Sequence, residues 1–138
     1  MANEDCFKAA YDWLVLRMKR CIGEPPGGVF YPIWAWHSLD NKPVKVDLRR
    51  SEFNNYCGDH YILTIDVPYE QVLLSDEESW HFVLNNWFLS DAKSEKDFDK
   101  AEAWFDSLSL NEQRQVKEKS WESIFDVNEI VNISFHEF

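Results

Sequence analysis

The sequence predicts an α+β fold in which a small, mostly antiparallel or mixed sheet packs with about four helices. Some segments repeat apolar residues at the three-and-four spacing of a helix face, and others alternate apolar and polar residues as half-buried strands do. The two kinds of segment follow one another without a regular strand–helix–strand rhythm. This mixture favours an α+β architecture over a parallel α/β sheet.

The length of 138 residues predicts one domain, residues 1–138. With 7 Trp and 10 Phe, the core is expected to consist of large rings, in preference to a surface that stacks on sugars or bases. The first residues show no basic region followed by an apolar one, and the apolar runs are far too short to cross a bilayer. We therefore expect a soluble, cytoplasmic protein without membrane association.

The first helix is expected to begin near Asn3, where a capping amide precedes two acidic residues. Gly23 is expected to end it in the left-handed conformation. Between these ends, helical spacing is kept by the apolar residues Phe7, Ala10, Tyr11, Leu14, Met18 and Cys21.

Several segments have the composition of strands. Residues 29–37 are rich in aromatic and β-branched side chains, but Pro32 lacks an N–H group and restricts them to an edge strand, a bulge or two short pieces. Residues 60–67 show the clearest alternation of apolar and polar side chains. Shorter strands are expected at residues 44–48, 72–74 and 131–138.

Residues 73–87 are expected to carry the central helix. Ser75 followed by Glu78 matches a capping box, so Ser75 is expected to cap a helix that begins near Asp76. A junction of strand and helix leaves free backbone N–H groups, which makes it a common place for a site. Helical spacing is kept here by Trp80, Val83, Leu84, Trp87 and Phe88, and the first four are expected to be mostly buried.

Two further helices complete the predicted set. One is expected to begin at about Glu95 and to carry Phe98, Ala101, Phe105 and Leu108 on a single face. Asn111 is expected to cap the other, whose apolar positions are Val116, Trp121 and Ile124.

The net charge of −11 is unevenly divided along the chain. Residues 1–55 contain 8 Lys or Arg and 7 Asp or Glu, whereas residues 56–138 contain 6 and 18. An acidic surface repels phosphate backbones, so direct nucleic-acid binding is not expected. The same surface is compatible with a basic partner protein, and also with a role in solubility alone.

Six segments, in order, resemble the bacterial domain-of-unknown-function family numbered 3841. They are AYDWLVLRM at residues 10–18, PPGGVFYPIWAW at 25–36, KVDLR at 45–49, VLLSD at 72–76, WHFVLNNWFL at 80–89 and SWESIFD at 120–126. This chain departs from the family at Ser75-Asp76-Glu77-Glu78, where the family motif has a Ser-Asp-Phe-Asp run. The resemblance implies a domain identity for most of the chain and no mechanism.

The polar residues attached to these segments form a candidate site. A cation, carboxylates and imidazoles that converged on one cleft could bind an anionic small molecule or perform acid–base chemistry. The alternative is a buried polar network. Arg49 is expected to approach Asp76 or His81, and Trp34 and Trp36 to line a pocket from one side of their strand. The full candidate set is Trp34, Trp36, His37, Asp47, Arg49, Ser75, Asp76, His81 and Asn85.

No metal or cofactor is expected. Cys57-x-x-His60 is half of a zinc motif, and a structural zinc ion needs four ligands. Gly27-Gly28 lies beside prolines and is read as a turn, so no phosphate-cradling loop is present.

Two functional classes remain open at this point, and with them the question of enzymatic activity. The chain is either a non-catalytic binding protein for a basic partner or a small enzyme or binding domain for a nucleotide-like anionic ligand. The charge division favours the binding protein. The oligomeric state is left open.

Overall fold

The computed structural model describes residues 3–39, 42–43, 49 and 61–127. The chain divides into two compact units, each described here by itself. The first, the helical unit, is formed by Met1–Tyr31 and Leu73–Val127. The second comprises Pro32–Val72 and Asn128–Phe138.

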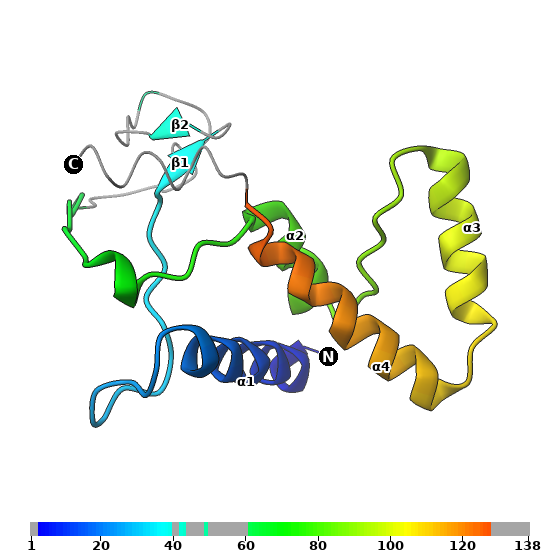
Figure 1. Cartoon of the computed structure of the whole chain (residues 1–138), viewed down its shortest axis with the longest axis horizontal. Coiled ribbons are helices and arrows are strands. Elements are labelled where there is room, and N and C mark those ends of the chain that lie inside the picture. The colour runs from blue at the N-terminus through cyan, green and yellow to red at the C-terminus, as the bar shows by residue number, and fades with distance from the viewer. Residues whose placement is uncertain (1–2, 40–41, 44–48, 50–60, 128–138) are drawn as a thin grey trace. The chain divides into compact units, whose positions relative to one another are not determined.

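The described residues of the helical unit form four α-helices and one 3₁₀-helix (Figure 1). In chain order these are α1 (Asn3–Cys21), α2 (Glu77–Leu84), α3 (Glu95–Asp106), α4 (Leu110–Ser120) and η2 (Trp121–Phe125). The described part of the second unit contains β1 (Ser38–Leu39), β2 (Lys42–Pro43) and the 3₁₀-helix η1 (Tyr69–Gln71). β1 and β2 pair antiparallel, with Ser38 opposite Pro43.

The predicted α+β class is wrong, because helices make the fold of the described residues and the one β-pair has two residues in each strand. Residues 29–37, 61–67 and 72–74 form no strand. Tyr61 and Ile62, which would face opposite sides of such a strand, are both exposed. Strand-favouring side chains need a partner strand and a surface to cover, so composition alone does not produce a sheet. The predicted strands at 44–48 and 131–138 lie outside the described residues, as does His60.

Helix α1 begins and ends where the sequence predicts. It starts at Asn3 and ends at Cys21, and its last turn closes with a hydrogen bond of 2.7 Å from the Ile22 N–H to the Met18 carbonyl. Gly23 follows with a φ of +118°, a conformation that is strained for any residue with a side chain. The chain therefore leaves the helix at this glycine.

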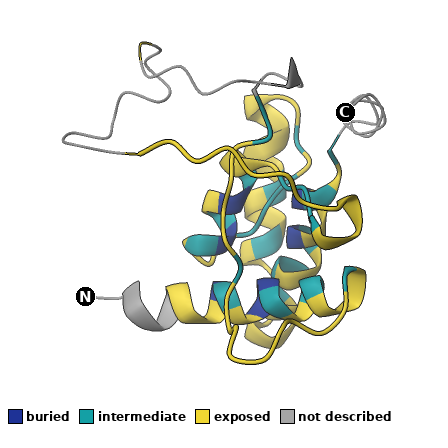
Figure 2. Cartoon of the chain, turned by 90° about the vertical axis from the view of Figure 1, so that its left-hand side faces the viewer, coloured by how far each residue is buried: buried dark blue, intermediate teal, exposed yellow. Residues whose placement is uncertain are grey.

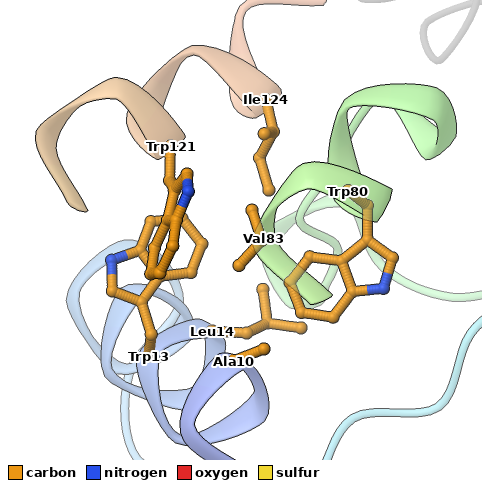
Figure 3. Close-up of a cluster of buried hydrophobic side chains, with 7 residues drawn as sticks. All are labelled: Ala10, Trp13, Leu14, Trp80, Val83, Trp121 and Ile124. Atoms are coloured by element: carbon orange, nitrogen blue, oxygen red, sulfur yellow. The ribbon is translucent and has the colours of Figure 1, made fainter. Parts of the chain in front are cut away.

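The core lies between α1, α2 and η2, as Figure 3 shows. Val83 of α2 and Ile124 of η2 are fully buried, and Leu14 of α1 points toward them. The rings of Trp13 and Trp121 meet edge to face with their centroids 5.5 Å apart. Figure 2 colours the buried residues of the chain dark blue. The core thus joins the N-terminal helix to segments of the C-terminal half.

The sequence placed the start of α2 one residue too early. Asp76, and not Ser75, is the N-cap, and its carboxylate accepts a hydrogen bond of 2.8 Å from the Ser79 N–H. The Asp76 N–H donates to the Ile124 carbonyl at 2.8 Å, a contact across the core that fixes this residue outside the helix. The prediction that Ser75 caps the helix is therefore wrong.

Helix α2 also ends earlier than the apolar spacing predicts. Asn86 adopts a φ of +58°, the Asn86 N–H donates to the Val83 carbonyl, and the Trp87 N–H donates to the Phe82 carbonyl. This is the Schellman arrangement, completed by an edge-to-face contact between the rings of Phe82 and Trp87. Trp80 and Val83 are buried as predicted, but Trp87 lies beyond the helix and is 57% exposed.

The later helices match the prediction in position more closely than in packing. α3 begins at Glu95, as predicted. α4 is capped by Ser109, and not by Asn111, through a capping box with Glu112. Trp121 and Ile124 are buried on η2, while neither α3 nor α4 contains a buried residue.

Candidate functional site

The nine sequence-predicted site residues are divided between the two units. Ser75, Asp76, His81 and Asn85 belong to the helical unit, and Asp47 lies outside the described residues. The second unit contains Trp34, Trp36, His37 and Arg49. The expected approach of Arg49 to Asp76 or His81 therefore stays a prediction.

The polar side chains on α2 bind to their own helix. His81 Nε2 lies 3.2 Å from a Glu77 carboxylate oxygen, one turn earlier. Asn85 Nδ2 donates to the His81 carbonyl at 2.7 Å. Asp76, His81 and Asn85 are all exposed. These bonds stabilise the two ends of α2 and form neither a closed pocket nor a buried network.

In the second unit, His37 is the predicted site residue with the most distinctive environment. It is half-buried, and this burial lowers its pKa, because a protonated imidazole loses hydration there. Trp34 and Trp36 are both exposed. Their exposure is compatible with the predicted ring pocket, which stays a prediction.

A shallow open groove lies along the outer face of α1, and the sequence did not predict it. Its volume is about 340 Å³, and its lining consists of Asp12, Val15, Leu16, Lys19, Phe30 and Tyr31. The charged groups at its rim already have partners, because Lys8 binds Asp12 and Glu24 binds Lys19. The edge-to-face contact between Tyr31 and Tyr11, at 5.9 Å, holds the turn after α1 against the helix. Most of the groove wall is apolar, and it offers no polar group set for chemistry.

Helix α3 is a capped amphipathic helix whose apolar face is not buried. Ser94 caps it, accepting a hydrogen bond of 3.2 Å from the Asp97 N–H and donating one of 2.6 Å to the Asp97 carboxylate. The helix is amphipathic, and its apolar face carries Phe98, Ala101 and Phe105 as predicted, whereas the fourth predicted residue, Leu108, follows the end of α3 at Asp106. None of these side chains is buried.

The apolar face of α3 is anchored by one aromatic residue of the preceding segment. The ring of Phe88 stacks on Phe105 with centroids 4.7 Å apart and an interplanar angle of 1°. Phe88 also lies 6.3 Å from the ring of Trp104. Trp104 is 51% exposed and Phe98 is 36% exposed, so the rings on either side of this anchor remain in contact with solvent.

One edge of this apolar face is acidic. Glu95, Asp99, Glu102 and Asp106 are spaced by four, three and four residues, which aligns them along α3 next to Phe98. We name these four residues the acidic stripe. No ion pair involves them within the described residues, and the lysine that binds Asp97, at 3.8 Å, is Lys100. The stripe therefore keeps its charge available to a partner.

The residues of this surface are recognisable in the sequence, but their exposure is not. The helical spacing gave the apolar face of α3, and the same spacing contains the acidic stripe. What the spacing did not reveal is that α1, α2 and η2 complete the core without α3. No group of three or more metal-binding side chains occurs in the part of the chain that the structure describes. In that same part, no helix has the length and apolar character needed to span a membrane.

The chain matches the model of a protein family. The model of the family described as "Domain of unknown function (DUF3841)" matches residues 1–136. No curated protein and no solved structure matches the chain.

Proposed function

We propose that this chain binds a basic partner protein through the acidic surface of its helical unit. The chain belongs to the DUF3841 family of domains of unknown function. The observation that carries this proposal is the exposure of the acidic residues. Residues 73–127 contain 13 Asp or Glu and 6 Lys or Arg, a net charge of −7. All thirteen acidic residues are exposed.

Most of these carboxylates have no role inside the fold. Asp76 caps α2, and Asp97 and Glu112 accept hydrogen bonds from the capping serines of α3 and α4. Glu77 lies beside His81, and Glu122 binds Arg17. The remaining eight make no hydrogen bond or ion pair within the described residues. They are Glu78, Asp91, Glu95, Asp99, Glu102, Asp106, Glu118 and Asp126.

An excess of one charge on an exposed surface attracts a partner of the opposite charge over several ångströms. Such attraction raises the rate of association and disfavours acidic partners and phosphate backbones. It weakens as salt shortens the Debye length, from about 30 Å at 0.01 M to about 8 Å at 0.15 M. Salt sensitivity is therefore the expected signature of this binding.

The test begins with capture of proteins from a host lysate by the full chain, at about 50 mM and about 300 mM salt. A partner is then purified, and its affinity is measured for the wild type and for a fourfold variant, Asp91→Lys, Asp99→Lys, Glu102→Lys and Glu118→Lys. We expect a basic partner whose affinity falls about tenfold or more with salt and with the fourfold substitution. A partner that binds the variant as tightly as the wild type, or that is insensitive to salt, contradicts the proposal.

A further inference from the structure

We infer that α3 is the docking site for a basic amphipathic helix of the partner protein. This inference rests on the proposed function, because it specifies where on the acidic surface the partner binds and in what conformation. It is carried by the position of the acidic stripe beside an apolar helix face that the fold leaves unburied.

The surface of α3 has a shape that suits a bound helix. α3 has twelve residues, which corresponds to about 18 Å of helix, or about three turns. Over this length its apolar side chains form one continuous face, and Phe88 widens the face by stacking on Phe105. A helix laid along such a face contacts it at positions i, i+3, i+4 and i+7, which is a recurring mode of peptide recognition.

The apolar face of α3 has exposed aromatic rings beside it. Phe98 at its N-terminal end and Trp104 toward its C-terminal end are both exposed. Aromatic side chains bury large areas with little loss of side-chain freedom, and they dominate the binding energy of many interfaces. The two rings are separated by six positions along α3, which at 100° per residue places them at the two edges of the apolar face, about 120° apart around the helix.

The charged residues of α3 are divided between different sides of the helix. At 100° per residue, the acidic stripe occupies one flank of α3 next to Phe98, whereas Lys96 and Lys100 lie on the opposite side from Phe98. A bound helix with Leu-type residues on one face and Lys or Arg beside them would pair with both features at once. The stripe therefore specifies a basic partner, and the apolar face specifies an amphipathic one.

A second copy of this chain fits the same face poorly. Pairing of two copies through α3 would bring two acidic stripes into one interface, and like charges in an interface oppose association. The expected complex is therefore formed by one copy of the chain and one partner helix.

The experiment uses the full chain and a fluorescein-labelled synthetic peptide of about 18 residues, or five turns. Leu residues at i, i+3, i+4 and i+7 give the peptide an apolar face, and Lys residues occupy the other positions. A second peptide has the same composition in scrambled order and has no apolar face. Fluorescence anisotropy gives the affinity of each peptide at low salt, and light scattering gives the stoichiometry.

Two variants with equal changes in net charge separate the stripe from the rest of the surface. Asp99→Lys/Glu102→Lys alters the stripe, and Asp91→Lys/Glu118→Lys alters two exposed acids outside α3 whose carboxylates make no hydrogen bond or ion pair among the described residues. A third variant, Trp104→Ser, removes one exposed ring. Circular dichroism checks that each variant keeps the helix content of the wild type.

We expect the amphipathic peptide to bind about tenfold more tightly than the scrambled one, equivalent to about 1.4 kcal/mol. The stripe variant and Trp104→Ser should each weaken binding of the amphipathic peptide by about tenfold, and the Asp91/Glu118 variant by less than about threefold. Equal binding of both peptides, equal effects of the two charge variants, or a dimer of the chain that the peptide does not dissociate overturns the docking inference and leaves the proposed function standing. Failure of both peptides to bind at low salt contradicts the proposed function as well.

Discussion

Ile124 is the residue whose truncation tests the core most directly. It is fully buried, it lies on η2 between α1 and α2, and its carbonyl accepts the hydrogen bond from the Asp76 N–H. Ile124→Ala removes three carbon atoms from this position and leaves the backbone hydrogen bond in place. The substitution therefore reports on packing alone.

The expected loss follows from burial. Removing three buried carbon groups costs about 2.4 kcal/mol of transfer free energy, at about 0.8 kcal/mol each. A cavity term is added because Val83 and Leu14 relax only partly into the space, so the total loss in the free energy of unfolding should be about 3–4 kcal/mol. Ile124→Val, which removes one carbon, should cost about 1 kcal/mol.

The measurement is urea unfolding followed by far-ultraviolet circular dichroism and by tryptophan fluorescence. Leu110→Ala is the matched control, because Leu110 also lies in the C-terminal half but is 85% exposed, and its truncation should cost less than about 0.5 kcal/mol. A loss below about 1 kcal/mol for Ile124→Ala, or an equal loss for Leu110→Ala, would refute the assignment of Ile124 to the core.

Three further predictions concern caps and titrating groups. Asp76→Ala should lower the free energy of unfolding by about 1 kcal/mol, whereas Ser75→Ala should lower it by less, and the reverse order in thermal unfolding would restore Ser75 as the cap. The hydrogen bond from the Ser109 hydroxyl, followed by that from its N–H, lowers the pKa of Glu112, so this contribution to stability is present above the ordinary value of 4.5 and is lost as the pH falls through the lowered pKa. Ser109→Ala should move the Glu112 pKa upward in an NMR titration, and an unchanged pKa would contradict the capping box. Burial lowers the pKa of His37, so the folded state should lose stability as the pH falls below 6.5. His37→Gln should therefore flatten the dependence of the melting temperature on pH between about pH 5 and 7, and an unchanged dependence would contradict this prediction.

The helices were predictable because their signals are local. Phe7, Ala10 and Leu14 lie on one face of α1 by spacing alone, and Gly23 ends that helix by its own conformational freedom. The start of α3 at Glu95 follows in the same way from Ser94 and the apolar spacing behind it. Such patterns need no knowledge of the rest of the chain.

The errors occurred where distant residues decide the outcome. Ser75 and Asp76 are both acceptable caps, and the hydrogen bond from the Asp76 N–H to Ile124 selects the second. The alternation at residues 60–67 indicated a strand, but pairing depends on other segments, and residues 61–67 form none. The end of α2 was missed for a different reason, because Asn86 adopts the left-handed conformation that is usually left to glycine.

For the candidate site, the sequence supplied the residue types and the structure supplied their exposure. The acidic residues of α3 and its apolar face are both visible in the spacing. These residues can form a binding surface only because they are not buried. That they are not buried follows from the core around Val83, Trp121 and Ile124, which contains no residue of α3. The predicted site residues are divided between the two units, with Arg49 in the second unit and Asp76 and His81 in the helical unit. Their common position in family-like segments of the sequence did not place them on one element.

The ion pair between Arg17 and Glu122 joins residues 105 positions apart, and this distance has a consequence for synthesis on the ribosome. At about 5–20 residues per second, α1 is made about 5–20 s before η2, the segment that carries Glu122. During that interval Trp13 and Leu14 lack the residues that bury them, so the nascent chain exposes an apolar helix face to chaperones and to other nascent chains. A premature stop codon before Trp121 would make this transient state permanent, and its product should aggregate or be degraded.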